Sequence, residues 1–212
     1  MWSGWAEDLA ARLCAATGRD LSGLVFAMLG YDPVAREAQP GGALVATPMA
    51  RIHDLTAEIL SGHGLADDAV RSAMADAWHA PDPVTLAHPL VDLASLLGGM
   101  RASGRRTAIA TSDDREPTHR TLRALGIEHL VDAVVCADDD VGSKPMPDPI
   151  LHVCAQLGIA PARAAVVGDS RADIAMGRAA GAGLVVGVRT GIGTDADLTD
   201  ADIIVDSVAA FG

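Results

Sequence analysis

Aromatic residues are scarce in this sequence of 212 residues, at 3% of the total, although half of the chain is hydrophobic. The core must therefore be built from Ala, Val, Leu and Ile, and there are few rings on which single-stranded nucleic acid could stack. Basic residues are also few, because 16 Lys and Arg stand against 28 Asp and Glu, a net charge of −12. This charge repels a polyphosphate backbone, so we expect no nucleic-acid partner. A small anionic substrate would need a metal ion or a local cation.

Cysteine is limited to Cys14, Cys136 and Cys154, which have no CxxC spacing. This set excludes a disulfide framework and a structural zinc site, and it favours three buried thiols in a reducing cytoplasm. No apolar stretch approaches the roughly 18–20 uncharged residues of a membrane span. The first residues, with Glu7 and Asp8, do not resemble a signal peptide. We therefore expect a cytoplasmic protein without a membrane partner.

The first part of the chain, up to about residue 85, has the spacing of apolar residues that is typical of helices. Polar segments rich in Pro or Gly separate the helical stretches. No segment in this part of the sequence alternates between apolar and polar residues, as a strand would, over a useful length. The predicted helices cover residues 5–16, 21–29, 49–60 and 67–78. The sequence therefore predicts an α-helical domain over residues 1–85.

From about residue 86, short apolar runs alternate with helical periods. The predicted strands cover residues 107–111, 133–136, 164–167, 184–188 and 203–205, and the predicted helices cover residues 90–100, 117–125, 148–157 and 171–180. At the start of the third of these helices, Asp148 is expected as the N-cap and Pro149 as the first helical residue. Runs that are apolar on both faces indicate a parallel sheet covered by helices on both sides. The predicted fold class of residues 86–212 is a doubly wound α/β sheet.

Polar side chains follow directly after three of the predicted strands. Thr111 and Ser112 follow the first strand, Lys144 lies in the loop after the second, and Asp169 and Ser170 follow the third. Ligands of open parallel sheets bind beyond the carboxyl ends of the strands, so these residues are expected to share one rim. Hydroxyl and backbone N–H groups donate to phosphate oxygens, and Lys144 adds a positive charge.

Asp169 and Asp173 could hold Mg²⁺, which takes one or two carboxylates together with substrate oxygens and waters. Each residue of the rim also has a plain structural explanation. A Thr at a strand end caps a turn, and a Lys in a Pro-rich loop is usually solvated. Acids at a helix start favour the macrodipole by about 0.3–1 kcal/mol each. It is the ordered combination that indicates a phosphate and magnesium site.

That combination resembles the haloacid dehalogenase superfamily, a large group of aspartate-nucleophile phosphatases. Residues 107–111, TAIAT, are similar to its second motif, residues 142–148, GSKPMPD, to its third, and residues 166–173, VVGDSRAD, to its fourth. The match covers about residues 90–204 and looks most like the phosphoglycolate-phosphatase-like members. The helical first part resembles the cap domain that many members insert between the first and second motifs.

The resemblance implies a role for each matched residue. Thr111 would bind the transferring phosphoryl group, and Lys144 would neutralise the nucleophile and the phosphate. The metal ligands would act directly or through water. The implied site residues are Thr111 and Lys144 for catalysis, Ser112 and Ser170 for substrate binding, and Asp169 and Asp173 for Mg²⁺.

The first motif of the family, DxDxT, has no match in the sequence. In the family, one of its aspartates is the nucleophile and the other protonates the leaving group. Asp8 lies inside a helical pattern with no apolar strand before it, so it does not qualify as the nucleophile. Asp113, beside the second motif, is expected to accept backbone hydrogen bonds near a helix start.

The strand that carries this motif is the central one in the strand order of the family, 3-2-1-4-5. Without it, roughly four to eight buried backbone groups lose their partners, at about 1–3 kcal/mol each. Either the sheet re-pairs, or water enters, or the missing strand is supplied. We expect that Met1 is an internal methionine and that the full protein begins roughly 15–20 residues earlier.

The function implied by the resemblance is Mg²⁺-dependent hydrolysis of a small phosphorylated metabolite through an aspartyl-phosphate. A cap of this size would exclude larger substrates. The motifs do not separate phosphatase from phosphomutase, and the sequence carries no signal for the substrate or the oligomeric state. The alternative is an inactive phosphate-binding or regulatory module that has lost its nucleophile.

Three further patterns are expected to be structural only. The seven histidines are scattered without the paired spacing of a zinc site. The acidic runs 138–140 and 195–202 are expected to be solvated loops. Residues 191–193, Gly-Ile-Gly, lack the strand-to-helix setting of a dinucleotide-binding loop.

Overall fold

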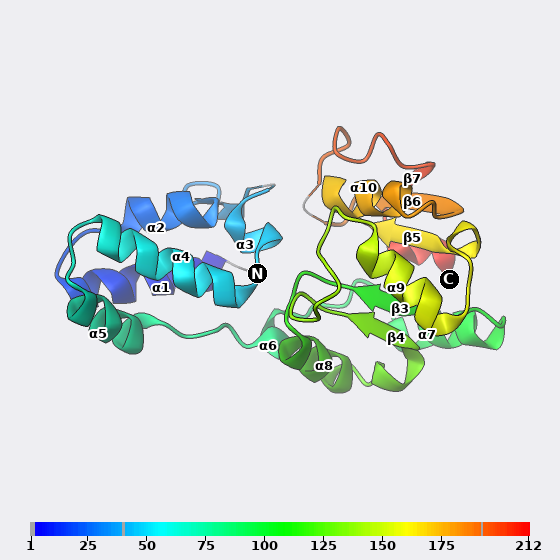
Figure 1. Cartoon of the computed structure of the whole chain (residues 1–212), viewed down its shortest axis with the longest axis horizontal. Helices are drawn as coiled ribbons and strands as arrows, with labels where there is room; N and C mark the ends of the chain where they lie inside the picture. The colour runs from blue at the N-terminus through cyan, green and yellow to red at the C-terminus, as the bar shows by residue number, and fades with distance from the viewer. Residues whose placement is uncertain (1–2, 40, 192) are drawn as a thin grey trace. The chain divides into compact units, whose positions relative to one another are not determined.

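The computed structural model describes residues 3–39, 41–191 and 193–212. This part of the chain divides into two compact units, the first ending at Asp82 and the second beginning at Pro83. In Figure 1 the first unit is coloured blue to teal and the second teal-green to red. The division lies close to the domain boundary expected near residue 85. The expectation for Met1 falls outside the described residues, as does the part of the 191–193 segment that is Ile192.

The first unit consists of helices and one short hairpin. The helices are α1 (Ser3–Thr17), α2 (Ser22–Leu29), α3 (Ala43–Ala46), α4 (Met49–Gly62) and α5 (Asp67–Ala77), and the hairpin pairs β1 (Tyr31–Asp32) with β2 (Glu37–Ala38). The four predicted helices are present. The hairpin differs from the prediction, because its strands are too short to show an alternating pattern.

The core of the first unit is mainly aliphatic, with Trp5 and Tyr31 buried in it as well. Its helices turn their apolar faces toward one another, and the Leu and Ile side chains with no exposed surface are Leu9, Leu13, Leu29, Ile52 and Leu60. Burial of each of these Leu and Ile side chains stabilises the fold by about 1.5–3 kcal/mol. Branched aliphatic side chains therefore supply most of this core, and the few aromatic residues join it, with Trp5 packed edge-to-face on Trp78.

Two glycines allow the chain to cross itself closely in the first unit. Gly30 ends α2 in the left-handed conformation, with φ of 65°. A methyl group on Gly30 would lie 2.5 Å from the Cα of Gly42, and one on Gly42 would lie 2.9 Å from the Cα of Gly30. Both positions therefore exclude a side chain on steric grounds, and Gly30 excludes one on conformational grounds as well.

The second unit alternates strands and helices. Its strands are β3 (Ala108–Ala110), β4 (Ala133–Val135), β5 (Ala165–Gly168), β6 (Leu184–Val188) and β7 (Ile203–Val205). Its α-helices are α6 (Pro83–Leu86), α7 (Leu93–Ala102), α8 (Arg115–Ala124), α9 (Asp148–Leu157) and α10 (Arg171–Ala179), and its 3-10 helices are η1 (Glu128–Leu130), η2 (Pro161–Arg163) and η3 (Val208–Phe211). The short helix α6 and the three 3-10 helices were not predicted.

The strands form two parallel sheets within the described part of the chain. β3 pairs with β4, whereas β5, β6 and β7 form a sheet in that order. β3 and β5 therefore each keep an edge without a strand partner among the described residues, at the place where the family would insert its central strand. Of the three alternatives set out above, re-pairing of these two edges does not occur in this structure.

Exposure along these edge strands differs from the expectation of burial on both faces. Val166 and Gly168 of β5 are buried, but Ala165 is exposed and Val167 is 43% exposed. Ala108 in β3 is also exposed. Apolar side chains that a covered sheet would bury are accessible beside these two edges.

Local signals explain where several helices begin and end. Asp92 caps α7, because its carboxylate accepts a hydrogen bond from the Ser95 N–H at 3.0 Å. Helix α9 ends at Gly158, which has φ of 64°. Its start differs from the prediction, because Asp148 is the first helical residue and not the N-cap, and Pro149 follows it as the second. Proline fits in this first turn because its missing N–H has no intrahelical partner there.

In the described part of the chain, no helix combines the length and the apolar character that a membrane span requires. Cys136 and Cys154 are buried, Cys14 is partly buried, and all three are free thiols. Burial raises the pKa of the Cys136 and Cys154 thiols. These two are therefore chemically quiet, small apolar residues.

Replacing Gly30 by Ala should destabilise the first unit more than replacing Gly18 by Ala. Both glycines have left-handed φ, but a methyl group on Gly18 meets nothing within 4 Å. We expect Gly18→Ala to lower the free energy of unfolding by about 1 kcal/mol, because alanine is strained at a left-handed φ. Gly30→Ala should lower it by the same amount and by a further loss of about 1–3 kcal/mol, because its methyl group overpacks the crossing. Urea titration followed by tryptophan fluorescence measures this difference, because all three tryptophans precede residue 83. Equal losses in the two variants would contradict the crossing of Gly30 and Gly42.

Candidate active site

An ion pair joins the loop after β4 to the helix after β5. Lys144 Nζ lies 2.7 Å from Asp173 Oδ1, and the two side chains are only 19% and 10% exposed. A partly buried pair of this kind is screened by water much less than a surface pair. The carboxyl ends of β4 and β5 therefore meet at one edge of the second unit.

Asp173 is held by the first turn of α10. Its Oδ2 accepts hydrogen bonds from the Ser170 hydroxyl at 2.7 Å and from the Ser170 and Asp169 N–H groups at 3.2 and 3.3 Å. The Ser170 hydroxyl in turn accepts from the Asp173 N–H at 3.2 Å, which completes a capping box. One carboxylate oxygen thus caps the helix while the other faces Lys144.

Gly168 makes this arrangement possible. It is the last residue of β5, and a methyl group there would overlap the Cβ of Asp173. Any other residue at this position would push Asp173 away from Lys144. The Gly-Asp pair that ends β5 is therefore required by space as well as by chemistry.

Thr111 and Ser112 lie at the end of β3, on the same edge. The Thr111 N–H continues the parallel ladder by donating to the Val135 carbonyl at 2.9 Å, so Thr111 is level with the start of the loop that carries Lys144. Its hydroxyl donates to Asp113 Oδ2 at 3.2 Å and accepts from the Asp113 N–H at 3.0 Å. Ser112 is partly buried beside it.

The structure thus brings four of the six predicted site residues into one hydrogen-bonded cluster. These are Lys144, Asp169, Ser170 and Asp173. Thr111 and Ser112 lie at the same edge, but the Thr111 hydroxyl bonds to Asp113 and not to the cluster. Asp113 was expected to accept backbone hydrogen bonds, but the donor to its carboxylate is the Thr111 hydroxyl.

Sequence reasoning missed a clamp built on Arg115. Its guanidinium pairs with the Asp139 carboxylate through two N–H groups, and its backbone N–H donates to Asp138 at 2.9 Å. The Asp139 carboxylate also accepts from the Cys136 N–H at 2.8 Å. The acidic run 138–140 is therefore a structured turn at the end of β4, whereas the sequence predicted a solvated loop. A basic residue in the first turn of α8 opposite three acids was the only available signal.

Two acids near Arg115 have pKa values shifted in opposite directions, for different reasons. The hydrogen bonds from Arg115 lower the pKa of Asp139. Burial, followed by the charges of Asp138 and Asp113, raises the pKa of Asp114. The pairing with Arg115 therefore contributes stability that is present above the ordinary carboxylate range and is lost as the pH falls through the lowered pKa of Asp139.

The residues at this edge could supply part of the ligand set of a magnesium site. Asp169 supplies a carboxylate that lies in a cradle beside Gly191, where a methyl group would overlap Asp169 Oδ2. Both oxygens of Asp173 are already engaged by Lys144 and by the helix cap. Among the described residues, no three His, Cys, Asp or Glu side chains are grouped closely enough to hold a metal ion. The chain therefore fits Mg²⁺ with Asp169 as one ligand, the remainder coming from phosphate, water or a further carboxylate.

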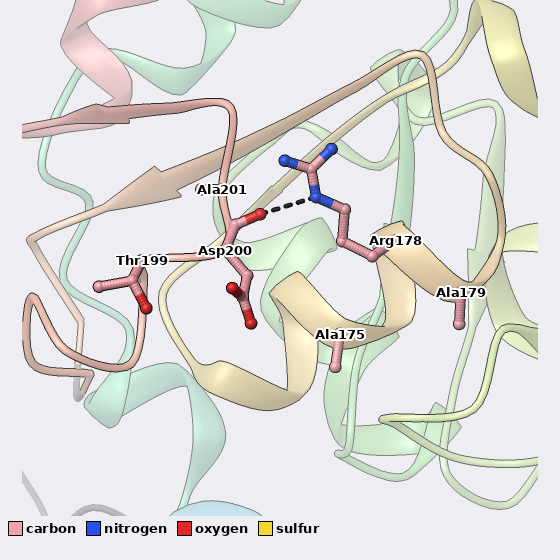
Figure 2. Close-up of a pocket in the computed structure, with 6 residues that line it drawn as sticks. All are labelled: Ala175, Arg178, Ala179, Thr199, Asp200 and Ala201. Carbon is pink, nitrogen blue, oxygen red and sulfur yellow. Dashed lines mark hydrogen bonds between the residues drawn. The ribbon is translucent and has the colours of Figure 1, made fainter.

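The hollow beside α10 in Figure 2, of about 770 Å³, is not this site. It is lined by Ala175, Ala179, Thr199 and Ala201, together with Arg178 and Asp200. Arg178 donates to the Asp200 carbonyl at 2.7 Å and pairs with Asp202 at 2.6 Å. The cation in this hollow is therefore engaged by protein groups.

Lys144 is the only lysine in the chain, and every other Lys or Arg position is an arginine. A compact ammonium suits a point contact with phosphate, whereas arginine favours planar, bidentate partners. This compositional signal adds to the motif in which Lys144 lies.

A family model described as "Hydrolase: haloacid dehalogenase-like hydrolase" matches residues 46–181. A phosphoglycolate phosphatase of Rhodospirillum rubrum is 35% identical over 131 residues, which are 59% of this chain and 54% of that protein. The chain spans about half the length of the curated relatives it matches.

Two solved structures share the fold. A "predicted phosphoglycolate phosphatase" from Haemophilus somnus 129PT aligns with a TM-score of 0.64 at 21% identity, over 95% of this chain and 88% of that one. A HAD family hydrolase from Deinococcus radiodurans R1, with bound phosphate and sodium, aligns with a TM-score of 0.55 at 21% identity, over 97% and 86%. The family model covers more than half of the chain, along the segment that contains Thr111, Lys144, Asp169 and Asp173. The chain therefore belongs to the haloacid dehalogenase-like hydrolases.

Proposed function

We propose that this chain carries most of the machinery of a Mg²⁺-dependent phosphatase for a small phosphorylated metabolite. The observation that carries the proposal is the partly buried ion pair between Lys144 and Asp173, 2.7 Å long, at the edge where β3 ends in Thr111. A fixed ammonium beside strand-end hydroxyl and N–H groups is suited to a phosphate dianion in an otherwise acidic protein.

In the proposed mechanism each residue of the edge has a separate task. The Thr111 hydroxyl turns from Asp113 to a phosphate oxygen, and the Ser112 N–H donates to another. Lys144 neutralises charge that develops during the transfer, and Asp173 keeps its ammonium in place. Ser170 acts through Asp173, because its hydroxyl donates to that carboxylate at 2.7 Å.

Asp169 would hold Mg²⁺ directly, and Asp173 would act on the metal only through water. This assignment is supported by the two oxygens of Asp173, because one is paired with Lys144 and the other accepts hydrogen bonds from the helix cap. Mg²⁺, when bound, offsets the negative charge of the phosphate and of the carboxylates around it.

The nucleophile would be an aspartate on a strand that lies between β3 and β5, supplied from outside the 212 residues. The edges of these two strands, which have no strand partner in the described part of the chain, support this location. The carboxylate would attack phosphorus as the bond to the leaving oxygen breaks, and a second aspartate would give that oxygen its proton. Water would then hydrolyse the aspartyl-phosphate, which restores the carboxylate and releases inorganic phosphate.

The name of the Rhodospirillum rubrum relative makes 2-phosphoglycolate the first substrate to test. The phosphate bound in the Deinococcus radiodurans structure supports a phosphate ligand for this fold. We also propose that the helical unit, expected over residues 1–85, is the cap domain that restricts the site to small substrates. The free thiols support a cytoplasmic location.

A second candidate function is a phosphate-binding or regulatory module without catalysis. One observation favours it: both oxygens of the Asp173 carboxylate are engaged, one by Lys144 and the other by the helix cap. Asp173 is then not available as a nucleophile. The two candidates differ in whether a nucleophile strand restores turnover.

Joining a DxDxT strand ahead of residue 1 should produce hydrolysis of p-nitrophenyl phosphate in the presence of Mg²⁺. The 212-residue chain alone should release no p-nitrophenol, because it contributes no nucleophile. In the extended chain, Asp169→Asn should lower kcat/KM by about 10²–10³-fold, as loss of one electrostatic contact typically does. The assay follows p-nitrophenol release and then phosphate release from 2-phosphoglycolate.

Asp200→Asn is the control, because Asp200 is an exposed acid in the loop beside α10 and should leave the rate unchanged. Turnover that survives Asp169→Asn would contradict the assignment of the site. An extended chain that binds phosphate but never turns over would favour the non-catalytic module.

Asp173→Asn should make Lys144 react faster with an amine-selective acylating reagent. The substitution removes the carboxylate that holds the ammonium at 2.7 Å, so the side chain becomes freer to move out to the reagent. We expect a faster acylation than in the wild type, measured by mass spectrometry of the peptide that contains the single lysine. Inorganic phosphate with Mg²⁺ should slow the reaction in the wild type.

Asp140→Asn is the matched control, because Asp140 is an exposed acid of the same loop. Its acylation rate should equal that of the wild type. A rate unaffected by both Asp173→Asn and phosphate would show that Lys144 lies outside the phosphate site.

A further inference from the structure

The main chain of Asp169 is fixed from both sides. Its N–H donates to Asp173 Oδ2 at 3.3 Å, within the first turn of α10. Its carbonyl accepts a hydrogen bond at 2.9 Å from the N–H of Gly193, which lies in the loop that follows β6. Both peptide groups that flank the side chain therefore have partners, and the direction of the Cα–Cβ bond is set.

The loop after β6 also contacts the carboxylate itself. A methyl group on Gly191 would overlap Asp169 Oδ2, Cγ and Cβ, so the backbone of Gly191 lies directly against this side chain. A methyl group on Gly193 would overlap the Asp169 carbonyl oxygen. The two glycines thus contact different parts of Asp169.

Space, and not backbone conformation, requires glycine at these two positions. Left-handed φ values occur at nine other glycines of the described chain, and neither Gly191 nor Gly193 is among them. The φ of neither position therefore excludes an alanine. What excludes it is the close approach to Asp169.

We propose that Gly191 and Gly193 are positioning residues that hold the Asp169 carboxylate in the orientation needed to bind the metal. This inference rests on the proposed function, because it assumes that Asp169 is a ligand of Mg²⁺. The contact restricts the side-chain rotamers of Asp169 before the metal arrives, so less freedom is lost on binding. Residues that orient a metal ligand commonly change metal affinity by 10–100-fold when they are replaced.

The first test is metal affinity, with Mn²⁺ as the spectroscopic substitute for Mg²⁺ and inorganic phosphate present. Electron paramagnetic resonance counts free Mn²⁺, so it reports binding without any turnover. We expect Gly191→Ala to weaken binding by at least about tenfold. Gly99→Ala is the matched control, because Gly99 lies in α7 with nothing within 4 Å of an added methyl group. Its Mn²⁺ affinity should equal that of the wild type.

The second test needs no metal and identifies the contact. Without metal, Gly191→Ala should lower the Tm by about 2–4 °C, which is the shift expected per kcal/mol in a chain of this size. In an Asp169→Gly background the same substitution should cost nothing, because all three overlapping side-chain atoms, Oδ2, Cγ and Cβ, are gone. Gly193→Ala should remain destabilising in that background, because its overlap is with a backbone oxygen.

The outcomes separate the positioning role from the proposed function. If Asp169→Asn weakens Mn²⁺ binding and Gly191→Ala does not, the metal site stands and the positioning role is wrong. If Gly191→Ala is equally destabilising with and without the Asp169 side chain, the contact is wrong and so is the inference. If the wild type binds no Mn²⁺ in the presence of phosphate, the proposed function fails and the positioning role fails with it.

Discussion

The ion pair between Lys144 and Asp173 connects two parts of the second unit that share no strand pairing. Lys144 lies in the loop after β4, which pairs with β3, whereas Asp173 lies in the helix after β5, which pairs with β6. Because Asp173 is also the third residue of a capping box, its position is fixed by the backbone of α10 and not by the lysine alone. The chemistry of the edge therefore depends on a helix cap, and the cap depends on a glycine that leaves room for it.

Elements with strong local signals could be predicted from the sequence. The helix α9 was predicted to end at Leu157, where Gly158 closes it, and its start was predicted to within one residue, because Pro149 lies in its first turn. The strand that ends at Gly168 and the helix that follows it were also predicted, since an apolar run gives way to an acid and a small polar residue. The clustering of Lys144 with Asp169 and Asp173 followed from the rule that parallel strands share an edge.

Contacts between distant segments could not be predicted in the same way. Nothing near Asp139 identifies Arg115 as its partner, because the pair spans the whole of α8 and β4. The hairpin between α2 and α3 has strands of only two residues, too short for a period. Gly191 and Gly193 were recognised as a pattern but not explained, because their reason is the position of Asp169, more than twenty residues earlier. Steric requirements of this kind become visible only when both segments are placed in space.

The free borders of β3 and β5 have a consequence for how the molecule behaves in concentrated solution. Among the described residues each of these strands offers N–H and C=O groups to any extended peptide that approaches, with Val167 accessible beside them. Such borders are templates for intermolecular β-pairing, and natural sheets usually protect them with charges, proline or a covering segment. A strand that paired with both of these edges would therefore protect the protein from aggregation through intermolecular β-pairing, in addition to any chemical role.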